Sequence, residues 1–290
     1  MEVTSAGDVS RLLDTTGYLA DDELATVTYL ALSMQRPLLL EGEPGTGKTA
    51  LAEALADSLE LPLVRLQCYE GIDATQALYD WDFPRQILHL RALEAAGAGS
   101  DVEEAEKSLY DERFLLARPV LAALQQSPAV LLVDEVDRAD DEFEAFLFEM
   151  LAEHSVTIPE LGTRHAIMPP VVILTSNRTT DLHDALKRRC LYHWIEHPGL
   201  ERELQIVRSR APEVSETLAR QVVVVVQQLR FGDLTKSPGV AETIDWARAL
   251  HHLGTAELDL ESAATTLGAL VKYREDSDRV KQALDQLLRT

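Results

Sequence analysis

The sequence predicts an α/β domain that is followed by a smaller, all-helical domain. As far as Pro198, short apolar runs typical of buried parallel strands alternate with helix-length segments, and beyond it almost every segment has a helical pattern. A glycine-rich loop also joins the first of these strands to the helix that follows it. We therefore expect residues 1–198 to form an α/β domain and residues 199–290 to form a helical one.

The elements of the first domain are expected from apolar runs and the breaks between them. Two segments depart from the alternation, an irregular stretch at about 69–84 and a hairpin pattern at about 156–167, while 94–112 has the composition of a helix end, a loop and a solvated helix face. In the second domain, the five valines at 222–226 lie inside a helix-length segment with polar flanks, so we expect a buried helix despite their strand propensity. The expected strands lie at 37–40, 63–66, 129–133, 171–174 and 191–195.

The glycine-rich loop has a sequence that is specific for phosphate binding. It satisfies the pattern G-x-x-x-x-G-K-S/T in full. Glycines permit the turns that aim successive N–H groups at phosphate oxygens, and the following helix adds its partially positive N-terminus. We expect the lysine to reach the β- and γ-phosphates and the threonine hydroxyl to ligate Mg²⁺, which predicts a site for ATP with Mg²⁺. The loop reads Gly42-Glu43-Pro44-Gly45-Thr46-Gly47-Lys48-Thr49 and continues into a helix at Ala50.

Two carboxylates, Asp134 and Glu135, follow the most apolar of the expected strands. Asp134 at the strand tip is expected to hold Mg²⁺, directly or through water. Glu135 is expected to polarise the water that attacks the γ-phosphate. An acidic pair after a strand can also simply begin a helix, but the phosphate-binding loop upstream favours the catalytic interpretation.

Asn177 follows the next expected strand along the chain. An amide at that strand tip can hydrogen-bond both the γ-phosphate and the attacking water, although Asn is also common as a helix cap or turn residue. We favour the functional interpretation because three strand tips then meet at the carboxyl edge of the sheet, where the ligands of open α/β sheets bind.

Three consecutive cations, Lys187-Arg188-Arg189, are conspicuous in a chain with 49 acidic and 27 basic residues. They can interact with the dipole at the C-terminus of a helix. Alternatively, one of them can serve as an arginine finger that reaches the phosphates bound by a neighbouring subunit. We favour the finger, and we prefer Arg189 to Arg188.

The order of these parts resembles that of the AAA+ ATPases: a phosphate loop, an Asp-Glu pair, a polar sensor, an arginine and a helical lid. This resemblance implies a three-layer αβα domain with a parallel sheet, and assembly into a ring, commonly a hexamer. The segments at 69–84 and 156–167 are similar to two insertions of the MoxR group. Stretches such as Gln67-Cys68-Tyr69-Glu70-Gly71 and Arg188-Arg189-Cys190-Leu191-Tyr192 are similar to the CoxD branch, which is associated with carbon monoxide dehydrogenase and related molybdenum hydroxylases.

The resemblance implies a chaperone or remodeller that assists the maturation of a metalloenzyme client, with a partner that carries a von Willebrand A domain. The chain departs from its relatives at the lid arginine, which they often carry in the sequence Ser-Pro-Arg. Here the lid reads Lys236-Ser237-Pro238-Gly239-Val240. Lys236 can replace that arginine as a point charge near the nucleotide, or it can be a solvated lysine.

The net charge of the chain indicates whether its partner is a protein or a nucleic acid. The formal net charge is −22, whereas a protein that binds nucleic acid through its phosphates needs clustered Lys and Arg. We therefore expect a protein partner and no nucleic acid. Two alternatives stay open: an AAA+ motor that acts on nucleic acid, and a nucleotide-gated binding scaffold with little turnover.

The first 30 residues lack an apolar signal core, and no stretch reaches the ~18 apolar residues that a bilayer span requires. We therefore expect a cytoplasmic protein without a membrane span. Cys68 and Cys190 show neither metal-type nor redox-type spacing, and we expect both to be reduced thiols.

Overall fold

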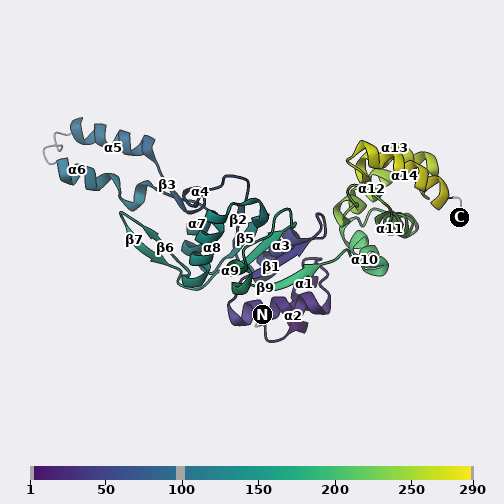
Figure 1. Cartoon of the computed structure of the whole chain (residues 1–290), viewed down its shortest axis with the longest axis horizontal. Helices are drawn as coiled ribbons and strands as arrows, with labels where there is room; N and C mark the ends of the chain where they lie inside the picture. The colour runs from purple at the N-terminus through teal and green to yellow at the C-terminus, as the bar shows by residue number, and fades with distance from the viewer. Residues whose placement is uncertain (1–2, 96–101, 289–290) are drawn as a thin grey trace.

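The computed structural model describes residues 3–95 and 102–288, and it confirms an α/β domain with a helical C-terminal region (Figure 1). Five parallel strands form the central sheet in the order β2-β5-β8-β1-β9. Every strand expected from the sequence is present in this sheet. The strands are β1 (Leu38–Gly42), β2 (Leu63–Gln67), β5 (Val130–Asp134), β8 (Val171–Ser176) and β9 (Leu191–Ile195).

Helices cover both faces of the sheet, which gives three layers. Successive side chains of a strand point to opposite faces. In β5, Leu131 and Val133 pack with the helices of one face, whereas Val130 and Leu132 pack with those of the other. Burial on both faces explains why these strands are continuous apolar runs. The first face carries α7 (Pro119–Gln125), α8 (Asp141–Glu153) and α9 (Asp184–Arg189), and the second carries α1 (Ala6–Asp14), α2 (Asp22–Met34) and α3 (Lys48–Leu59).

The insertion after β2 is longer than the stretch at 69–84 that the sequence indicated. It comprises α4 (Ala74–Leu78), β3 (Tyr79–Trp81), α5 (Phe83–Ala95), α6 (Val102–Leu109), the 3-10 helix η1 (Glu112–Phe114) and β4 (Leu115–Ala117). Because β3 and β4 pair antiparallel, the chain between them leaves the body and returns to it. Helices α5 and α6 form a projecting arm there (Figure 1). The described residues of the stretch at 94–112 agree with the expected helix end and solvated helix, since α5 ends at Ala95 and α6 follows at Val102–Leu109, and both belong to this arm.

The second expected insertion is confirmed as an antiparallel hairpin. Strand β6 (Ser155–Ile158) pairs with β7 (Gly162–His165), and Gly162 begins the return strand with a φ of +79°. A left-handed backbone favours glycine at such a turn. The hairpin lies between α8 and β8 in the chain, and Figure 1 places it on the same side of the body as the arm.

The C-terminal helices pack around their own apolar core. Trp246 is fully buried there, and Val222 and Val223 of the valine run are buried within a helix, as expected. The last strand of the sheet ends at Ile195, and the first lid helix begins at Leu200, on either side of the boundary predicted at 198–199. The lid helices are α10 (Leu200–Arg210), α11 (Glu216–Arg230), α12 (Val240–His252), α13 (Leu260–Leu270) and α14 (Arg274–Leu287).

A buried ion pair joins three of the lid helices. The side chains of Arg230 and Glu203 are only 7% and 0% exposed, and two hydrogen bonds of 2.6 Å connect the guanidinium to the two carboxylate oxygens. Gln227 and Thr243 also donate to Glu203. The carboxylate therefore depends on these donors for its solvation, since water cannot reach it.

Replacing Arg230 with Met is expected to lower the free energy of unfolding by about 3–5 kcal/mol, because it leaves the Glu203 carboxylate buried without its cation. Urea denaturation measures this change. Arg220→Met is the matched control: its pair with Glu201 spans 3.3 Å between side chains that are 50% and 71% exposed, so a change below about 1 kcal/mol is expected. Equal losses of unfolding free energy in the two variants would contradict the conclusion that the buried Glu203 depends on Arg230.

Both cysteines are buried and free. Burial raises the pKa of each thiol to about 12, which suits inert structural residues. In the described part of the chain, none of the helices has the length and apolar character needed to cross a membrane.

Candidate active site

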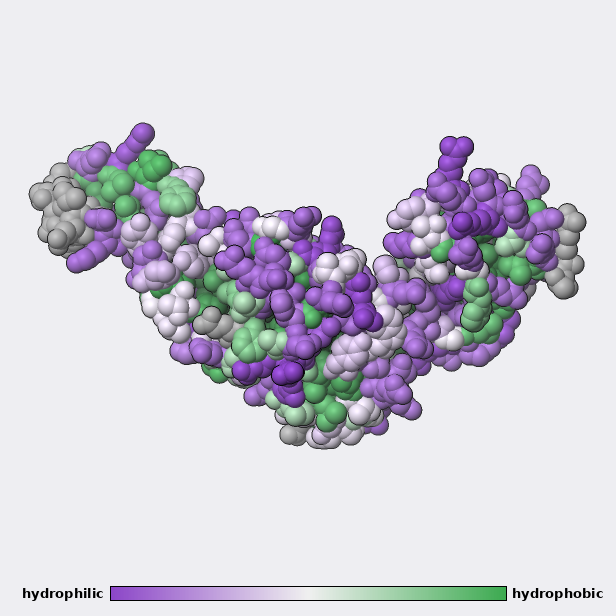
Figure 2. Space-filling view, in the orientation of Figure 1, coloured by the Kyte–Doolittle hydropathy of each residue, from purple (hydrophilic) through white to green (hydrophobic). Residues whose placement is uncertain are grey.

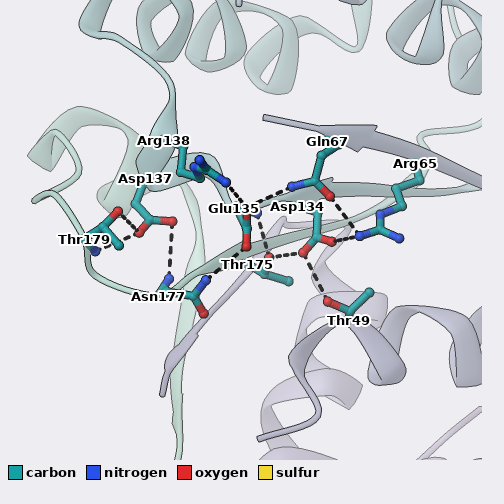
Figure 3. Close-up of polar contacts among 10 residues, drawn as sticks. All are labelled: Thr49, Arg65, Gln67, Asp134, Glu135, Asp137, Arg138, Thr175, Asn177 and Thr179. Atoms are coloured by element: carbon teal, nitrogen blue, oxygen red, sulfur yellow. Dashed lines mark hydrogen bonds and ion pairs between the residues drawn. The ribbon is translucent and has the colours of Figure 1, made fainter. Parts of the chain in front are cut away.

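The carboxyl ends of neighbouring strands bring the predicted site residues together. Parallel pairing places Gln67 opposite Asp134 across β2 and β5, and Gly42 opposite Ile195 across β1 and β9. Residues that lie far apart in the sequence thus meet at one edge of the sheet (Figure 3). This is the edge at which open α/β sheets bind their ligands.

The phosphate-binding loop connects β1 to α3 and depends on its glycines. Gly45 and Gly47 have φ values of +81° and +97°, which only glycine adopts without strain. At Gly42, a Cβ atom would lie 2.4 Å from the carbonyl oxygen of Ile195, so a side chain there would separate β1 from β9. These glycines therefore fix both the shape of the loop and its contact with the sheet.

The N-terminus of α3 leaves donors for an anion. The first backbone bond of the helix is donated by Leu51 to the carbonyl of Gly47, at 3.2 Å. The N–H groups of Lys48, Thr49 and Ala50 precede it, and a helix provides no intrahelical acceptor for groups in its first turn. Together with the helix dipole, they fit the phosphates of a nucleotide.

Lys48 is buried and folds back over the loop. Its Nζ donates to the carbonyl oxygens of Gly42 at 2.8 Å and Glu43 at 2.7 Å. Burial lowers the pKa of Lys48, while the nearby carboxylates, Asp137 foremost, act in the opposite direction. The ammonium is thus held by neutral oxygens, which a phosphate oxygen can replace as the stronger partner.

Asp134 is buried, and both of its carboxylate oxygens have partners (Figure 3). Oδ1 accepts hydrogen bonds from the hydroxyls of Thr49, at 3.1 Å, and Thr175, and Oδ2 pairs with the guanidinium of Arg65. The two Mg²⁺ ligands predicted from the sequence, Thr49 and Asp134, are therefore neighbours. A hydroxyl beside a carboxylate is the oxygen donor set that Mg²⁺ prefers, so these residues fit the ion.

Glu135 turns away from Asp134 because its backbone is left-handed, with φ of +54°. Its N–H donates to the hydroxyl of Thr175 at 2.9 Å, which holds this uncommon conformation. Its carboxylate accepts from Gln67 at 3.1 Å and from Asn177 at 3.4 Å. Arg138 forms an ion pair with it at 3.0 Å. The structure thus brings Glu135 and Asn177 into contact.

Asp137, which no local sequence pattern indicated, holds the backbone at Asn177 in place. It is fully buried, and its carboxylate accepts the backbone N–H groups of Asn177 at 3.2 Å and Thr179 at 2.8 Å. The hydroxyl of Thr179 donates to it as well, at 2.7 Å. These bonds fix the turn after β8 and hence the position of the Asn177 amide.

The two candidate finger residues lie apart from this site. Arg188 and Arg189 are exposed in the last turn of α9, and neither lines the cleft that contains the phosphate-binding loop. The guanidinium of Arg189 lies over the ring of Phe148, 4.8 Å from its centroid. The side chain of Arg36 donates to the backbone carbonyls of both arginines and so fixes this end of the helix.

The structure does not bring Lys236 to the phosphate-binding loop. Lys236 is exposed and absent from the lining of the cleft, and its backbone N–H donates to Asp276 at 3.1 Å. Gly239 approaches the loop instead, since a Cβ atom there would lie 2.8 Å from the Cα of Gly45. The lid therefore contacts the loop through its backbone, and of the two alternatives left open for Lys236 the structure agrees with the solvated lysine.

The cleft itself lies between the α/β domain and the lid and has a volume of about 1510 Å³. This exceeds the ~300–1,000 Å³ of typical small-molecule sites, so a nucleotide leaves room for the lid to close. From the α/β domain the loop, Asp134, Glu135 and Asn177 line it. The lid contributes residues of α10 and α12, among them Arg202 and Arg248.

Comparison with known proteins agrees with this geometry. The family model "AAA domain (dynein-related subfamily)" matches residues 37–190. The mouse nuclear valosin-containing protein-like is 24% identical over 164 residues, which cover 55% of this chain and 15% of the mouse protein. The uncharacterized protein YojN of Bacillus subtilis is 27% identical over 227 residues, covering 75% of this chain and 67% of that one.

Among solved structures, a mutant RuvB of Thermotoga maritima superposes with a TM-score of 0.50 at 14% identity, covering 91% of this chain and 70% of that chain. This likeness concerns the fold alone. Because the chain spans only 15% of the mouse protein, the activity of that whole protein does not transfer to it.

Proposed function

The chain belongs to the dynein-related subfamily of AAA domains, and from that premise we propose that it is an ATP-driven remodeller of other proteins. It is an ATP-hydrolysing enzyme that uses ATP with Mg²⁺, as its family does. Proteins of this family typically form rings.

In the proposed reaction, water attacks the γ-phosphate in line, a new P–O bond forms, and the bond to the leaving ADP oxygen breaks. Lys48 and the N–H groups at the start of α3 bind the phosphates. Glu135 accepts the proton of the water. Asn177, which contacts Glu135, orients the water. Thr49 and Asp134 would hold Mg²⁺, which would supply positive charge to offset the charge developing on the phosphate oxygens.

The arm supports remodelling of a protein over work on nucleic acid. On α5, the side chains of Phe83, Ile87 and Leu88 are 60%, 53% and 65% exposed. Figure 2 shows hydrophobic residues gathered over this part of the molecule. Exposed apolar patches of this kind mark sites of protein contact, whereas the net charge of −22 opposes phosphate binding along a nucleic acid.

The finer assignment rests on the resemblance to the MoxR group and its CoxD branch. Two segments support this proposal: the stretch at 69–84, from which the arm extends, and the stretch at 156–167, which contains most of the β6–β7 hairpin, are each similar to an insertion of that group. We assign the client to the molybdenum hydroxylases and the partner to proteins with a von Willebrand A domain, in a hexameric ring. Movement of the lid on hydrolysis would shift the arm against the client.

Activation of a metal-free molybdenum hydroxylase by the chain, ATP and metal cofactor tests the proposal. The double variant Ile87→Asp and Leu88→Asp is expected to retain the basal ATPase rate and to lose most of the activation, because it places charge on the contact face of α5. Leu253→Asp is the matched control, since Leu253 is equally exposed, at 62%, but lies on the lid.

Two outcomes would contradict the proposal. Full activation of the hydroxylase by the double variant would mean that the apolar residues of the arm do not contact the client. ATPase activity that is stimulated by DNA and falls steeply with salt would instead support a motor on nucleic acid.

A further inference from the structure

Glu41 is a buried carboxylate that the proposed reaction does not use. It follows the leucines of β1 and lies one residue before Gly42, where the phosphate-binding loop begins. Its side chain is only 4% exposed, so its charge depends on partners that the fold supplies. Well-packed apolar residues can often replace a buried ion pair without loss of stability. Folding alone therefore does not require a carboxylate at this position.

The partners of Glu41 come from the ends of two other strands. The hydroxyl of Tyr192, on β9, donates to its Oε2 at 3.1 Å. Burial raises the pKa of Tyr192 and the bond to Glu41 acts in the same direction, so the hydroxyl stays protonated as a donor. The Nε of Arg178 lies 3.6 Å from the same oxygen and supplies the positive charge. The guanidinium of Arg178 also lies over the ring of Trp194, 5.8 Å from its centroid.

Arg178 joins this carboxylate to the turn that carries Asn177. It follows Asn177 directly, in a left-handed conformation with φ of +55°, and its N–H donates to the hydroxyl of Ser176 at 3.0 Å. Parallel pairing of β1 and β8 places Ser176 opposite Glu41. The ion pair between Glu41 and Arg178 therefore starts one residue from the phosphate-binding loop and ends one residue from Asn177. Asp137 holds the backbone of the same turn from its other side.

We propose that Arg178 is a positioning residue for hydrolysis, which acts through Glu41 to hold Asn177 at a fixed distance from the phosphates on the loop. This inference rests on the proposed function, in which Asn177 orients the attacking water. A displacement of about 1 Å in such a group can lower a rate by a factor of about 10². Because neither Glu41 nor Arg178 lines the cleft, the ion pair acts on the rate of hydrolysis and not on the binding of nucleotide.

The rate of hydrolysis and the affinity for nucleotide, measured separately on the full chain, test this role. Phosphate release at saturating ATP gives kcat, and calorimetric titration with a non-hydrolysable ATP analogue gives the affinity. Arg178→Ala is expected to lower kcat by a factor of about 10–100 and to change the affinity by less than about twofold. Glu41→Gln, which keeps the shape of the side chain, should show the same pattern. Arg178→Lys, which keeps the charge but not the planar fork, should have an intermediate kcat.

The double variant tests whether the two residues act together. If Arg178 acts through Glu41, the loss of kcat in the double variant should be close to that of either single variant. Asp181→Asn is the matched control, because Asp181 is the other carboxylate near Arg178, at 3.9 Å, but its side chain is 86% exposed. Its kcat should stay within about twofold of the wild type. All rates are compared well below the melting temperature of each variant, so that loss of stability does not contribute.

Three outcomes would overturn the inference. Wild-type kcat in both Arg178→Ala and Glu41→Gln would make the ion pair purely structural. Full additivity of the two losses would mean that Arg178 acts without Glu41. Affinity for the analogue that falls in proportion to kcat would make Arg178 a nucleotide contact.

Asn177→Ala separates this inference from the proposed function. A slow Asn177→Ala variant beside an Arg178→Ala variant with wild-type kcat would contradict the inference alone. Wild-type kcat in Asn177→Ala would contradict the role of Asn177 in the proposed reaction, and the inference with it.

Discussion

Glu135→Gln is expected to lower the rate of ATP hydrolysis by a factor on the order of 10²–10⁴ and to leave ATP binding nearly unchanged. An amide has no basic oxygen to accept the proton of the attacking water. Asp134 cannot take over this role, because its oxygens are engaged by Thr49, Thr175 and Arg65. The phosphate-binding loop is untouched by the substitution. Phosphate release at steady state and calorimetric ATP titration measure the two effects separately.

Glu142→Gln makes the same chemical change at an exposed position in the first turn of α8, outside the cleft. Its rate should stay within about twofold of the wild type, as is typical of a surface substitution. If the wild type and Glu135→Gln hydrolyse ATP equally slowly and both bind the client, the chain is a nucleotide-gated scaffold and the remodelling mechanism fails.

The parts of the site that the sequence predicted are those whose chemistry is local. Gly42 to Thr49 form a continuous motif, and its glycines adopt the positive φ values that the motif requires. Asp134 and Asn177 each stand at the end of an apolar strand, and parallel pairing places such ends at one edge. Alternation of strands and helices was therefore enough to bring these residues together.

The residues that the sequence did not indicate depend on register and on tertiary packing. Gln67 contacts Glu135 only because β2 pairs with β5 so that Gln67 lies opposite Asp134. Asp137 differs from other acidic residues only by being buried under the turn after β8. No local pattern contains either fact.

Two larger features that the sequence left undecided have the same origin. The extent of the arm was not predicted, because α5 buries little apolar surface and its residues lack the apolar stripe of a packed helix. The sequence left open whether Lys236 lies near the nucleotide or is solvated, and the orientation of the lid brings Gly239 to the loop instead. A lid orientation is set by contacts between domains, which a motif does not encode.

Arg189→Ala is expected to reduce the ATPase rate of the assembled ring by a factor on the order of 10³–10⁵, the contribution of an arginine finger. The physical reason for this loss is the place of Arg189 on the surface of the chain. Arg189 is exposed and lies outside the cleft of its own chain, so its guanidinium is available to the phosphates of a neighbouring subunit. ATP binding by each subunit should persist, because the loop and Asp134 are intact. Arg188→Ala is the matched control, with a much smaller expected loss.

Mixing Arg189→Ala subunits with Glu135→Gln subunits tests whether the site is shared. Each variant alone is expected to be nearly inactive, for different reasons. In a mixed ring, an Arg189→Ala subunit keeps its own Glu135 and can receive the finger of a Glu135→Gln neighbour. Activity should therefore rise above that of either variant at those interfaces. Complete absence of this rise at every mixing ratio would contradict a site shared between subunits. A loss of activity confined to Arg188→Ala would transfer the role of the finger to Arg188.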